Sequence, residues 1–322
     1  MAEGGGAVDR PRVRDWGLAP GRLMPGARNA ITDVSGVRVG HTTLVSGSGR
    51  LCPGEGPVRT GVTVVLPHGG DLFQDKVRAA VHTINGYGKV YGFEQVRELG
   101  LLESPVALTN TLNVGLVADA LVQDAIRSHP AIGVRTSSVN VVVGETNDGY
   151  LNDLQGRHVR AEHVWAALEG ASPGPVAEGA VGAGTGTSCF GWKGGIGTAS
   201  RVLPKEGGGF TVGALVQTNF GRPEELMVLG VPAGREIRPP DEDEGRRGGD
   251  GSVMIVLATD APMTARQLHR LCVRAGAGLA RTGSVLDHGS GDFVIAFSAA
   301  SRVAQVPRRV VAERPMVVAA GR

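Results

Sequence analysis

The sequence has few cysteines and lacks a long apolar run. Cys52, Cys189 and Cys272 are its three cysteines, an odd number of widely separated thiols that fits neither a disulfide framework nor a paired zinc knuckle and favours a reducing compartment. No run of about 18 apolar residues occurs, which excludes a membrane-spanning helix. The first 22 residues also lack the apolar centre of a signal peptide. We therefore expect a cytoplasmic protein without a membrane partner.

Strong charge of either sign and cofactor motifs are also absent. The 33 Lys and Arg residues nearly balance the 31 Asp and Glu residues, and the net charge of +2 is too small for the field that binds nucleic acid. The sequence has no GxxxxGK(S/T) phosphate loop, and GAGTGTS at 182–188 lacks the spacing of a dinucleotide motif. His158 and His163 do not form an HExxH pattern. We expect no nucleic-acid partner, no cofactor and no metal.

What the sequence does contain is glycine and short apolar runs. Glycine accounts for 51 of the 322 residues, which predicts many tight turns. Residues 113–127 and 264–281 have the apolar spacing of helices, and Thr264 with Gln267 forms a capping box. Runs rich in Val, Ile and Ala predict buried strands at 62–66, 106–109, 139–143, 211–217, 253–259 and 293–298. Together they predict a single α+β domain over 1–322, with helices covering the sheets and a flexible tail at 1–22.

The chain changes character between Gly251 and Ser252. Residues 235–251 read REIRPPDEDEGRRGGDG and predict a mobile, solvated loop, whereas a strongly apolar run follows Ser252. A serine at this junction suits an N-terminal nucleophile. Its hydroxyl can attack the preceding carbonyl, and the amine freed by cleavage has a pKa of about 8, so that it can act as the base for its own hydroxyl. On local pattern alone, the alternative that Gly-Ser only closes a turn is favoured.

Seven blocks of sequence lie in order between Arg28 and Ser298. They read RNAITDVSGVRVGHTT (28–43), VALTNTLNVG (106–115), VVGETNDGYLND (142–153), GAGTGTSCFGWKGGIGTASR (182–201), LVQTNFG (215–221), GSVMIVLATDAPM (251–263) and HGSGDFVIAFS (288–298). Together they resemble the DmpA family of L-aminopeptidase/D-amidase/D-esterases and β-peptidyl aminopeptidases, with the nylon-oligomer hydrolases as more distant relatives. The resemblance implies a four-layer αββα sandwich of the N-terminal-nucleophile-hydrolase type. It also implies autocleavage into an α chain of residues 1–251 and a β chain of residues 252–322, and a homo-oligomer, such as a tetramer of αβ heterodimers.

The resemblance implies roles for five residues around the junction. Ser252 matches the family's nucleophile, with cleavage between Gly251 and Ser252, and Asn219 matches the oxyanion-hole asparagine, whose amide can donate to developing negative charge. Ser290 and Asp292 match the hydroxyl and carboxylate next to the nucleophile's amine. As residues i and i+2 of an extended segment, they point to the same side. The local alternatives are a turn cap for Asn219 and a polar turn for Ser290 and Asp292.

A second group is expected around the substrate. Glu145 matches the family's carboxylate that receives the substrate's free amino group through a charge-assisted hydrogen bond, with an exposed strand-end glutamate as the alternative. Either Asn147 or Tyr150 stands where some members have a tyrosine that assists the oxyanion. Asn110 is expected to border the pocket. Lys193 is expected to support the oxyanion-hole asparagine or to orient the cleavage loop, although a surface lysine is the alternative.

The predicted function is that of a cofactor-free, self-processing serine aminopeptidase or amidase. It would release N-terminal residues from short peptides, aminoacyl amides or esters through an acyl-enzyme on Ser252. The alternatives are a β-peptidyl aminopeptidase or amide-oligomer hydrolase of the same family, and an unprocessed, non-catalytic oligomer. The ornithine acetyltransferases share a related fold but use a threonine nucleophile, so Ser252 argues against them. The choice between L-α, D-α and β-aminoacyl substrates stays open, because it depends on pocket walls from several loops.

Overall fold

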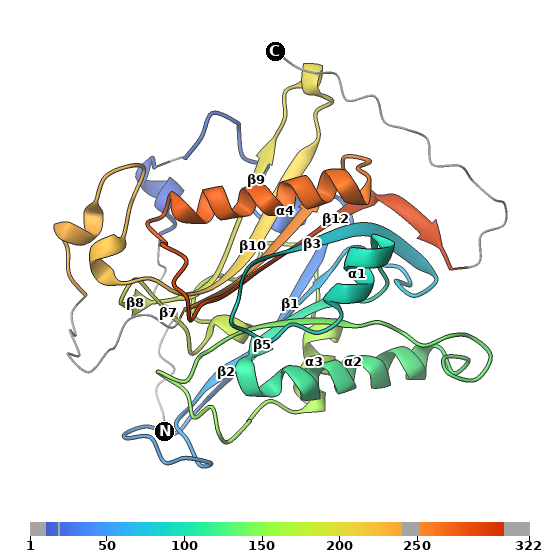
Figure 1. Cartoon of the computed structure of the whole chain (residues 1–322), viewed down its shortest axis with the longest axis horizontal. Helices are drawn as coiled ribbons and strands as arrows, with labels where there is room; N and C mark the ends of the chain where they lie inside the picture. The colour runs from blue at the N-terminus through green and yellow to red at the C-terminus, as the bar shows by residue number, and fades with distance from the viewer. Residues whose placement is uncertain (1–10, 19, 240–250, 306–322) are drawn as a thin grey trace.

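Strand pairing divides the β-structure into two sheets and one short hairpin. The computed structural model describes residues 11–18, 20–239 and 251–305 (Figure 1). The four-stranded sheet has the order β1 (Arg38–Ser46), β2 (Val58–Leu66), β5 (Val106–Asn110) and β6 (Val142–Thr146). The six-stranded sheet has the order β4 (Leu101–Leu102), β3 (Asp75–Gly86), β12 (Gly291–Ala304), β11 (Ser252–Thr259), β10 (Thr211–Asn219) and β9 (Gly195–Val202). Strands β7 (Ser188–Cys189) and β8 (Trp192–Lys193) form the hairpin.

Helices cover the outer face of each sheet. Figure 1 shows α4 (Ala265–Ala280) on one side of the molecule and α2 (Val114–Ser128) with α3 (Ala161–Glu169) on the other, with the two sheets between them. Helix α1 (Phe93–Leu99) packs near β3 and β4. Short 3-10 helices occupy Val13–Trp16, Ile31–Asp33, Thr111–Asn113, Gly182–Gly184, Lys205–Gly207, Pro223–Glu225 and Ala233–Arg235. The predicted four-layer αββα sandwich is confirmed. No helix in the described ranges is long and apolar enough to cross a membrane.

Three apolar clusters hold these layers together. One lies between the two sheets and includes Leu108 from β5 and Leu215, Met254 and Ile295 from the six-stranded sheet. The second joins the four-stranded sheet to α2 and α3, and the third joins the six-stranded sheet to α4. Because successive strand residues face opposite sides, β11 contributes to both the first and the third clusters and is almost wholly buried. The six-stranded sheet is therefore fixed on both faces, as a rigid support for residues at its edge.

The sequence-based elements match the structure unevenly. Both predicted helices are present, and Thr264 Oγ1 accepts a hydrogen bond from Gln267 N, as the capping box predicts. The strand expected at 139–143 is wrong in its bounds, because Asn140 N donates to a Glu103 side-chain oxygen and the ladder with β5 begins only at Val142. Strands β1, β3 and β9 and helices α1 and α3 were not predicted, since their sequences mix polar residues into the apolar pattern.

The structure describes only part of each of the two segments that the sequence predicts to be flexible. Within the tail predicted at residues 1–22, Arg12 pairs with Glu178 at 2.6 Å and donates to the Thr198 carbonyl at 2.7 Å. Residues 1–10 and 19 lie outside the described residues. The same is true of residues 240–250, which form most of the loop predicted at 235–251.

Candidate active site

The predicted nucleophile is the first residue of a central strand. Antiparallel pairing places Ser252 opposite Asn219, the last residue of β10, and parallel pairing places Ser252 beside Gly291, the first residue of β12. Three strand ends therefore meet at one point on the edge of the six-stranded sheet. Ser252 and Asn219 are on the side of the sheet that faces the inter-sheet core, because Met254 and Leu215 on the same strands and the same faces belong to that cluster.

Two donors hold the hydroxyl of Ser252. The backbone N–H of Asn147 donates to Ser252 Oγ at 3.0 Å, and Asn219 Nδ2 donates to it at 3.2 Å. Asn219 Oδ1 accepts a hydrogen bond from Ser188 N at 3.1 Å, which fixes the orientation of the amide with its NH2 toward Ser252. Ser252 as a whole is 3% exposed, so its hydroxyl is buried. Two neutral donors at a buried serine can stabilise negative charge that develops beside it.

Lys193 holds the backbone segment that contacts Asn219. Its Nζ donates to the carbonyls of Gly184, Thr187 and Gly194 at 2.9, 2.7 and 2.9 Å. The Thr187 carbonyl belongs to the peptide whose nitrogen is that of Ser188, the donor to Asn219. Partial burial lowers the pKa of Lys193 to about 8, an effect opposed by the nearby Asp148. Lys193 is an exposed residue of β8 whose ammonium holds the turn that orients Asn219.

The carbonyl that precedes Ser252 is also hydrogen-bonded. Gly291 N donates to Gly251 O at 3.0 Å, as the first bond of the parallel ladder between β11 and β12. A β-carbon at Gly251 would lie 3.1 Å from Ser290 Oγ. Ser290 is therefore next to the Gly251–Ser252 peptide, and an N–H dipole already polarises the Gly251 carbonyl.

Ser290 and Asp292 form a buried pair. Ser290 Oγ donates to Asp292 Oδ1 at 2.6 Å, and the two residues are 3% and 1% exposed. Burial raises the pKa of Asp292, although the bond from Ser290 opposes the shift. Within the described part of the chain, Asp292 Oδ2 has no hydrogen-bond partner. Asp292 is thus able to take a proton through Ser290, which lies beside the peptide bond at Gly251.

Glu145 is at the end of β6, two residues before Asn147. One carboxylate oxygen accepts from the backbone N–H of Lys89 at 2.9 Å and the other from the Thr111 hydroxyl. The residue is 2% exposed, and burial raises the pKa of Glu145 against the effect of these two bonds. Glu145 is a buried and fixed carboxylate, not the exposed strand-end glutamate considered as its alternative.

The remaining predicted residues are in different surroundings. Asn147 contacts Ser252 through its backbone amide, while its side-chain oxygen accepts from Gly149 N at 3.0 Å. Tyr150 is 51% exposed at the rim of a cavity. Asn110 is 1% exposed and donates to Thr60 Oγ1 at 2.9 Å, which favours a supporting role over the predicted contact with substrate.

Sequence reasoning missed two buried residues beneath the site. Gln217 Nε2 donates to Thr109 O, Thr146 Oγ1 and Ala183 O at 3.1, 2.7 and 3.0 Å, and so joins β10 to the four-stranded sheet. Asp148 is 1% exposed and accepts from Asn152 Nδ2 at 3.0 Å. Burial raises the pKa of Asp148 to about 6. A polar residue at i−2 from Asn219 on an inward-facing strand position was the signal available for Gln217.

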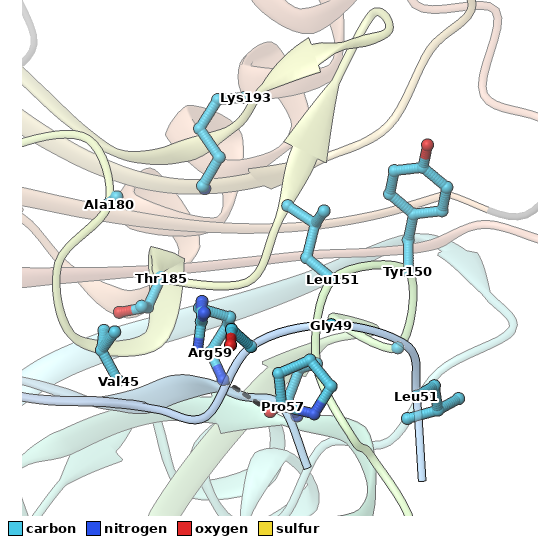
Figure 2. A pocket seen from close by; sticks show the side chains of 13 residues that line it. Val45, Gly49, Leu51, Pro57, Arg59, Tyr150, Leu151, Ala180, Thr185 and Lys193 are labelled. Carbon is cyan, nitrogen blue, oxygen red and sulfur yellow. Dashed lines mark hydrogen bonds between the residues drawn. The ribbon is translucent and has the colours of Figure 1, made fainter. Parts of the chain in front are cut away.

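A cavity of about 550 Å³ adjoins these segments. One wall comes from Gly149–Asn152, immediately after the amide that contacts Ser252, and another from Thr185 and Lys193, on the segment that holds Asn219. In Figure 2 Tyr150 and Leu151 lie opposite Ala180 and Thr185, with Arg59 and Pro57 between them. The two chain segments that position the donors to Ser252 thus also line this cavity.

Comparisons with known proteins identify the family. A model of peptidase family S58 matches residues 29–319. The β-peptidyl aminopeptidase BapA of Sphingosinicella microcystinivorans is 46% identical over 314 residues, which cover 94% of this chain and 78% of that protein. The solved structure of the PH0078 protein from Pyrococcus horikoshii OT3 is 48% identical, with a TM-score of 0.88 and coverage of 94% of this chain and 83% of that chain.

A third relative bears on the fold. The L-aminopeptidase D-Ala-esterase/amidase of Ochrobactrum anthropi is 39% identical, with a TM-score of 0.86 and coverage of 96% of this chain and 84% of that chain. It is described as a prototype of the serine aminopeptidases and as a variant of the Ntn hydrolase fold. The resemblance to the DmpA family is thereby confirmed. The chain belongs to peptidase family S58 and is a hydrolase, an aminopeptidase of the N-terminal-nucleophile type.

Proposed function

We propose that the chain cleaves itself between Gly251 and Ser252 and then uses Ser252 as nucleophile and base. The observation that carries this proposal is the pair of contacts at one peptide: two donors hold Ser252 Oγ, and Gly291 N–H donates to the carbonyl of Gly251. In the first step Ser252 Oγ attacks the Gly251 carbonyl carbon, the C–N bond breaks, and the acyl group moves from nitrogen to oxygen. Ser290 and Asp292 relay the hydroxyl proton to the departing nitrogen. Water then hydrolyses the ester, releasing the Gly251 carboxylate and a free Ser252 amine.

The mature site would hydrolyse an aminoacyl substrate in two steps. The Ser252 amine, with an ordinary pKa of about 8, takes the proton of its own hydroxyl as Oγ attacks the substrate carbonyl. Asn219 Nδ2 and Asn147 N stabilise the oxyanion, since both already face Ser252 Oγ. The protonated amine gives its proton to the leaving nitrogen, and water hydrolyses the resulting ester. Ser290 orients the amine, and Asp292 holds Ser290.

Intact mass tests the processing step. Wild-type protein should yield a fragment of 71 residues, 252–322, of about 7 kDa, whose N-terminal sequence is SVMIV. Ser252→Ala should remain a single chain of 33.2 kDa and lose all turnover. Cleavage at the same bond in Ser252→Ala would refute the mechanism. A wild-type chain that stays whole would instead favour the unprocessed, non-catalytic alternative.

Glu145 is proposed to receive the free amino group of the substrate. An ammonium opposite a buried carboxylate makes a charge-assisted hydrogen bond, which an acetylated amine cannot make. Glu145→Gln should therefore raise KM for free-amine substrates much more than it lowers kcat. If the variant rejects N-acetylated substrates as strongly as the wild type does, this role is wrong.

We propose β-aminoacyl compounds as the preferred substrates. The support is the name of the BapA relative, a β-peptidyl aminopeptidase that matches nearly the whole chain. The test compares β-alanyl, L-alanyl and D-alanyl p-nitroanilides, which share one leaving group. A single methylene in a shaped pocket is worth roughly tenfold or more in kcat/KM, so the β-alanyl compound should exceed the other two by at least that factor. A higher kcat/KM for the L-alanyl compound would reassign the enzyme to α-aminoacyl substrates.

A further inference from the structure

We propose that the cavity beside Asn147 binds the leaving-group side of the substrate and favours an apolar side chain there. This inference rests on the proposed roles of Ser252 and Glu145. It adds a specificity determinant at the part of the substrate that departs first.

The order of contacts along one chain segment gives the direction. Glu145, proposed for the amino group, comes first, Asn147 N–H at the nucleophile follows, and Gly149–Asn152 then line the cavity. Glu145 has its own neighbours, Lys89 and Thr111, and neither residue lines the cavity. A substrate whose amine is at Glu145 and whose carbonyl carbon is at Ser252 therefore extends its leaving group past Asn147. Glu145, Asn147, Asn219 and Ser252 do not line the cavity themselves. Gly149 does line it, and its N–H donates to Asn147 Oδ1 at 3.0 Å, which connects the cavity to the residue that contacts Ser252.

The walls have the chemistry of an apolar subsite. Val45, Leu51, Pro57, Tyr150 and Leu151 contribute aliphatic and aromatic surface. Three of them, Val45, Leu51 and Tyr150, are 62%, 55% and 51% exposed. Burial of such surface against an apolar side chain removes both surfaces from water, which favours binding.

The two cations at the cavity are already engaged by the protein. Arg59 donates to the carbonyls of Ser46, Val58 and Gly47 at 2.8, 2.6 and 2.8 Å. Lys193 donates to three other backbone carbonyls. Because these donors have partners, the cavity does not require an anionic ligand to satisfy them. The cavity should therefore recognise a substrate mainly through apolar contact.

Filling the cavity should discriminate between leaving groups. Val45 is exposed at the end of β1, so Val45→Trp adds bulk to the cavity without disturbing the core. Two substrates with the same β-alanyl group are compared: β-alanyl-leucine, whose leaving group is leucine, and β-alanine amide, whose leaving group is ammonia. The variant should lose about tenfold in kcat/KM for β-alanyl-leucine, since a leucine side chain no longer gains burial there. For β-alanine amide kcat/KM should stay within about twofold of the wild-type value.

The matched control is Val134→Trp, which places the same bulk at a valine that is 79% exposed and does not line the cavity. This variant should keep the wild-type ratio between the two substrates. Equal losses for both substrates in Val45→Trp would overturn the inference. So would a larger loss for β-alanine amide than for β-alanyl-leucine, because the cavity would then not serve the leaving-group side of the scissile bond.

A binding measurement separates this inference from the chemistry at Ser252. N-acetyl-leucinamide has no free amine and resembles the leaving-group side of a substrate. In Ser252→Ala protein, saturation-transfer NMR should detect its binding, and Val45→Trp in that background should abolish it. Unchanged binding in the double variant would refute the subsite. The two proposals can also fail separately. If Val45→Trp abolishes binding but the wild-type chain does not cleave itself, the subsite is supported and only the proposed self-processing is refuted.

Discussion

Asp148 provides a test of the electrostatics beneath the active site. Asp148 is 1% exposed, and burial raises the pKa of its carboxyl from the ordinary value of 3.8 to about 6, despite hydrogen bonds from Thr60, Asn152 and Asn110. A carboxyl with a raised pKa binds its proton more tightly in the folded state than in the unfolded state. The folded state then carries more protons between about pH 4 and pH 6, so the stability falls as the pH rises through this window.

The size of the effect follows from the shift. A difference of about two pKa units corresponds to about 3 kcal/mol of unfolding free energy. Asp148→Asn cannot ionise, so it should escape this loss. Its unfolding free energy relative to that of the Asp148 parent should therefore increase by about 2 kcal/mol between pH 4 and pH 7, because part of the full effect is already present at pH 4.

The assay is urea unfolding at several pH values between 4 and 8. The Ser252→Ala background is used, which keeps the chain whole and the unfolding transition comparable. Asp119→Asn, at an exposed carboxylate on α2, serves as the matched control and should leave the pH dependence unchanged. If the difference between Asp148→Asn and its parent is the same at pH 4 and pH 7, the reasoning about the buried carboxyl is refuted.

Three further predictions concern side chains around the nucleophile. Asn219→Ala removes one of the two donors to Ser252 Oγ and should lower kcat by about 10² to 10³; a kcat within threefold of the wild type would remove Asn219 from the oxyanion site. Lys193→Met should lower kcat more than it raises KM, because the turn that orients Asn219 loses three hydrogen bonds, and steady-state kinetics that show only a KM effect would contradict this. Gln217→Leu leaves three buried acceptors without their donor and should cost roughly 3 kcal/mol or more, which a thermal unfolding midpoint close to that of the parent would disprove.

The sequence was most informative where one pattern repeats locally. Helices α2 and α4 have a continuous apolar face, and strand β11 is a run of apolar residues between a polar loop and a turn. Strand β3 was missed because it reads DKVRAAVHTING, with polar residues at several positions. Its place in the sheet comes from pairing with β12, more than 200 residues away in the chain. Pairing energy of this kind leaves no local signal.

The side chains proposed for the site could be singled out from the sequence, but several of their hydrogen-bond partners could not. The sequence placed Ser252 at a junction between loop and strand, and the resemblance of seven blocks singled out Asn219, Ser290 and Asp292. The second donor to Ser252 Oγ is the backbone amide of Asn147, and the donor to the Gly251 carbonyl is the backbone amide of Gly291. Every residue except proline carries such an N–H, so residue identity does not mark these two positions.

The sequence by itself determined the family and the layered α+β class, and it singled out Ser252 as the proposed nucleophile, because these depend on residue types in a fixed order along the chain. Only the tertiary structure decided what surrounds Ser252. The end of β6, the starts of β11 and β12 and the end of β10 meet at that point although they are far apart in sequence. The cavity likewise combines the connection between β1 and β2 with Gly149–Asn152 and Lys193. Contacts of this kind form only when packing of the two sheets brings distant segments together, since burial of the apolar faces fixes their relative position.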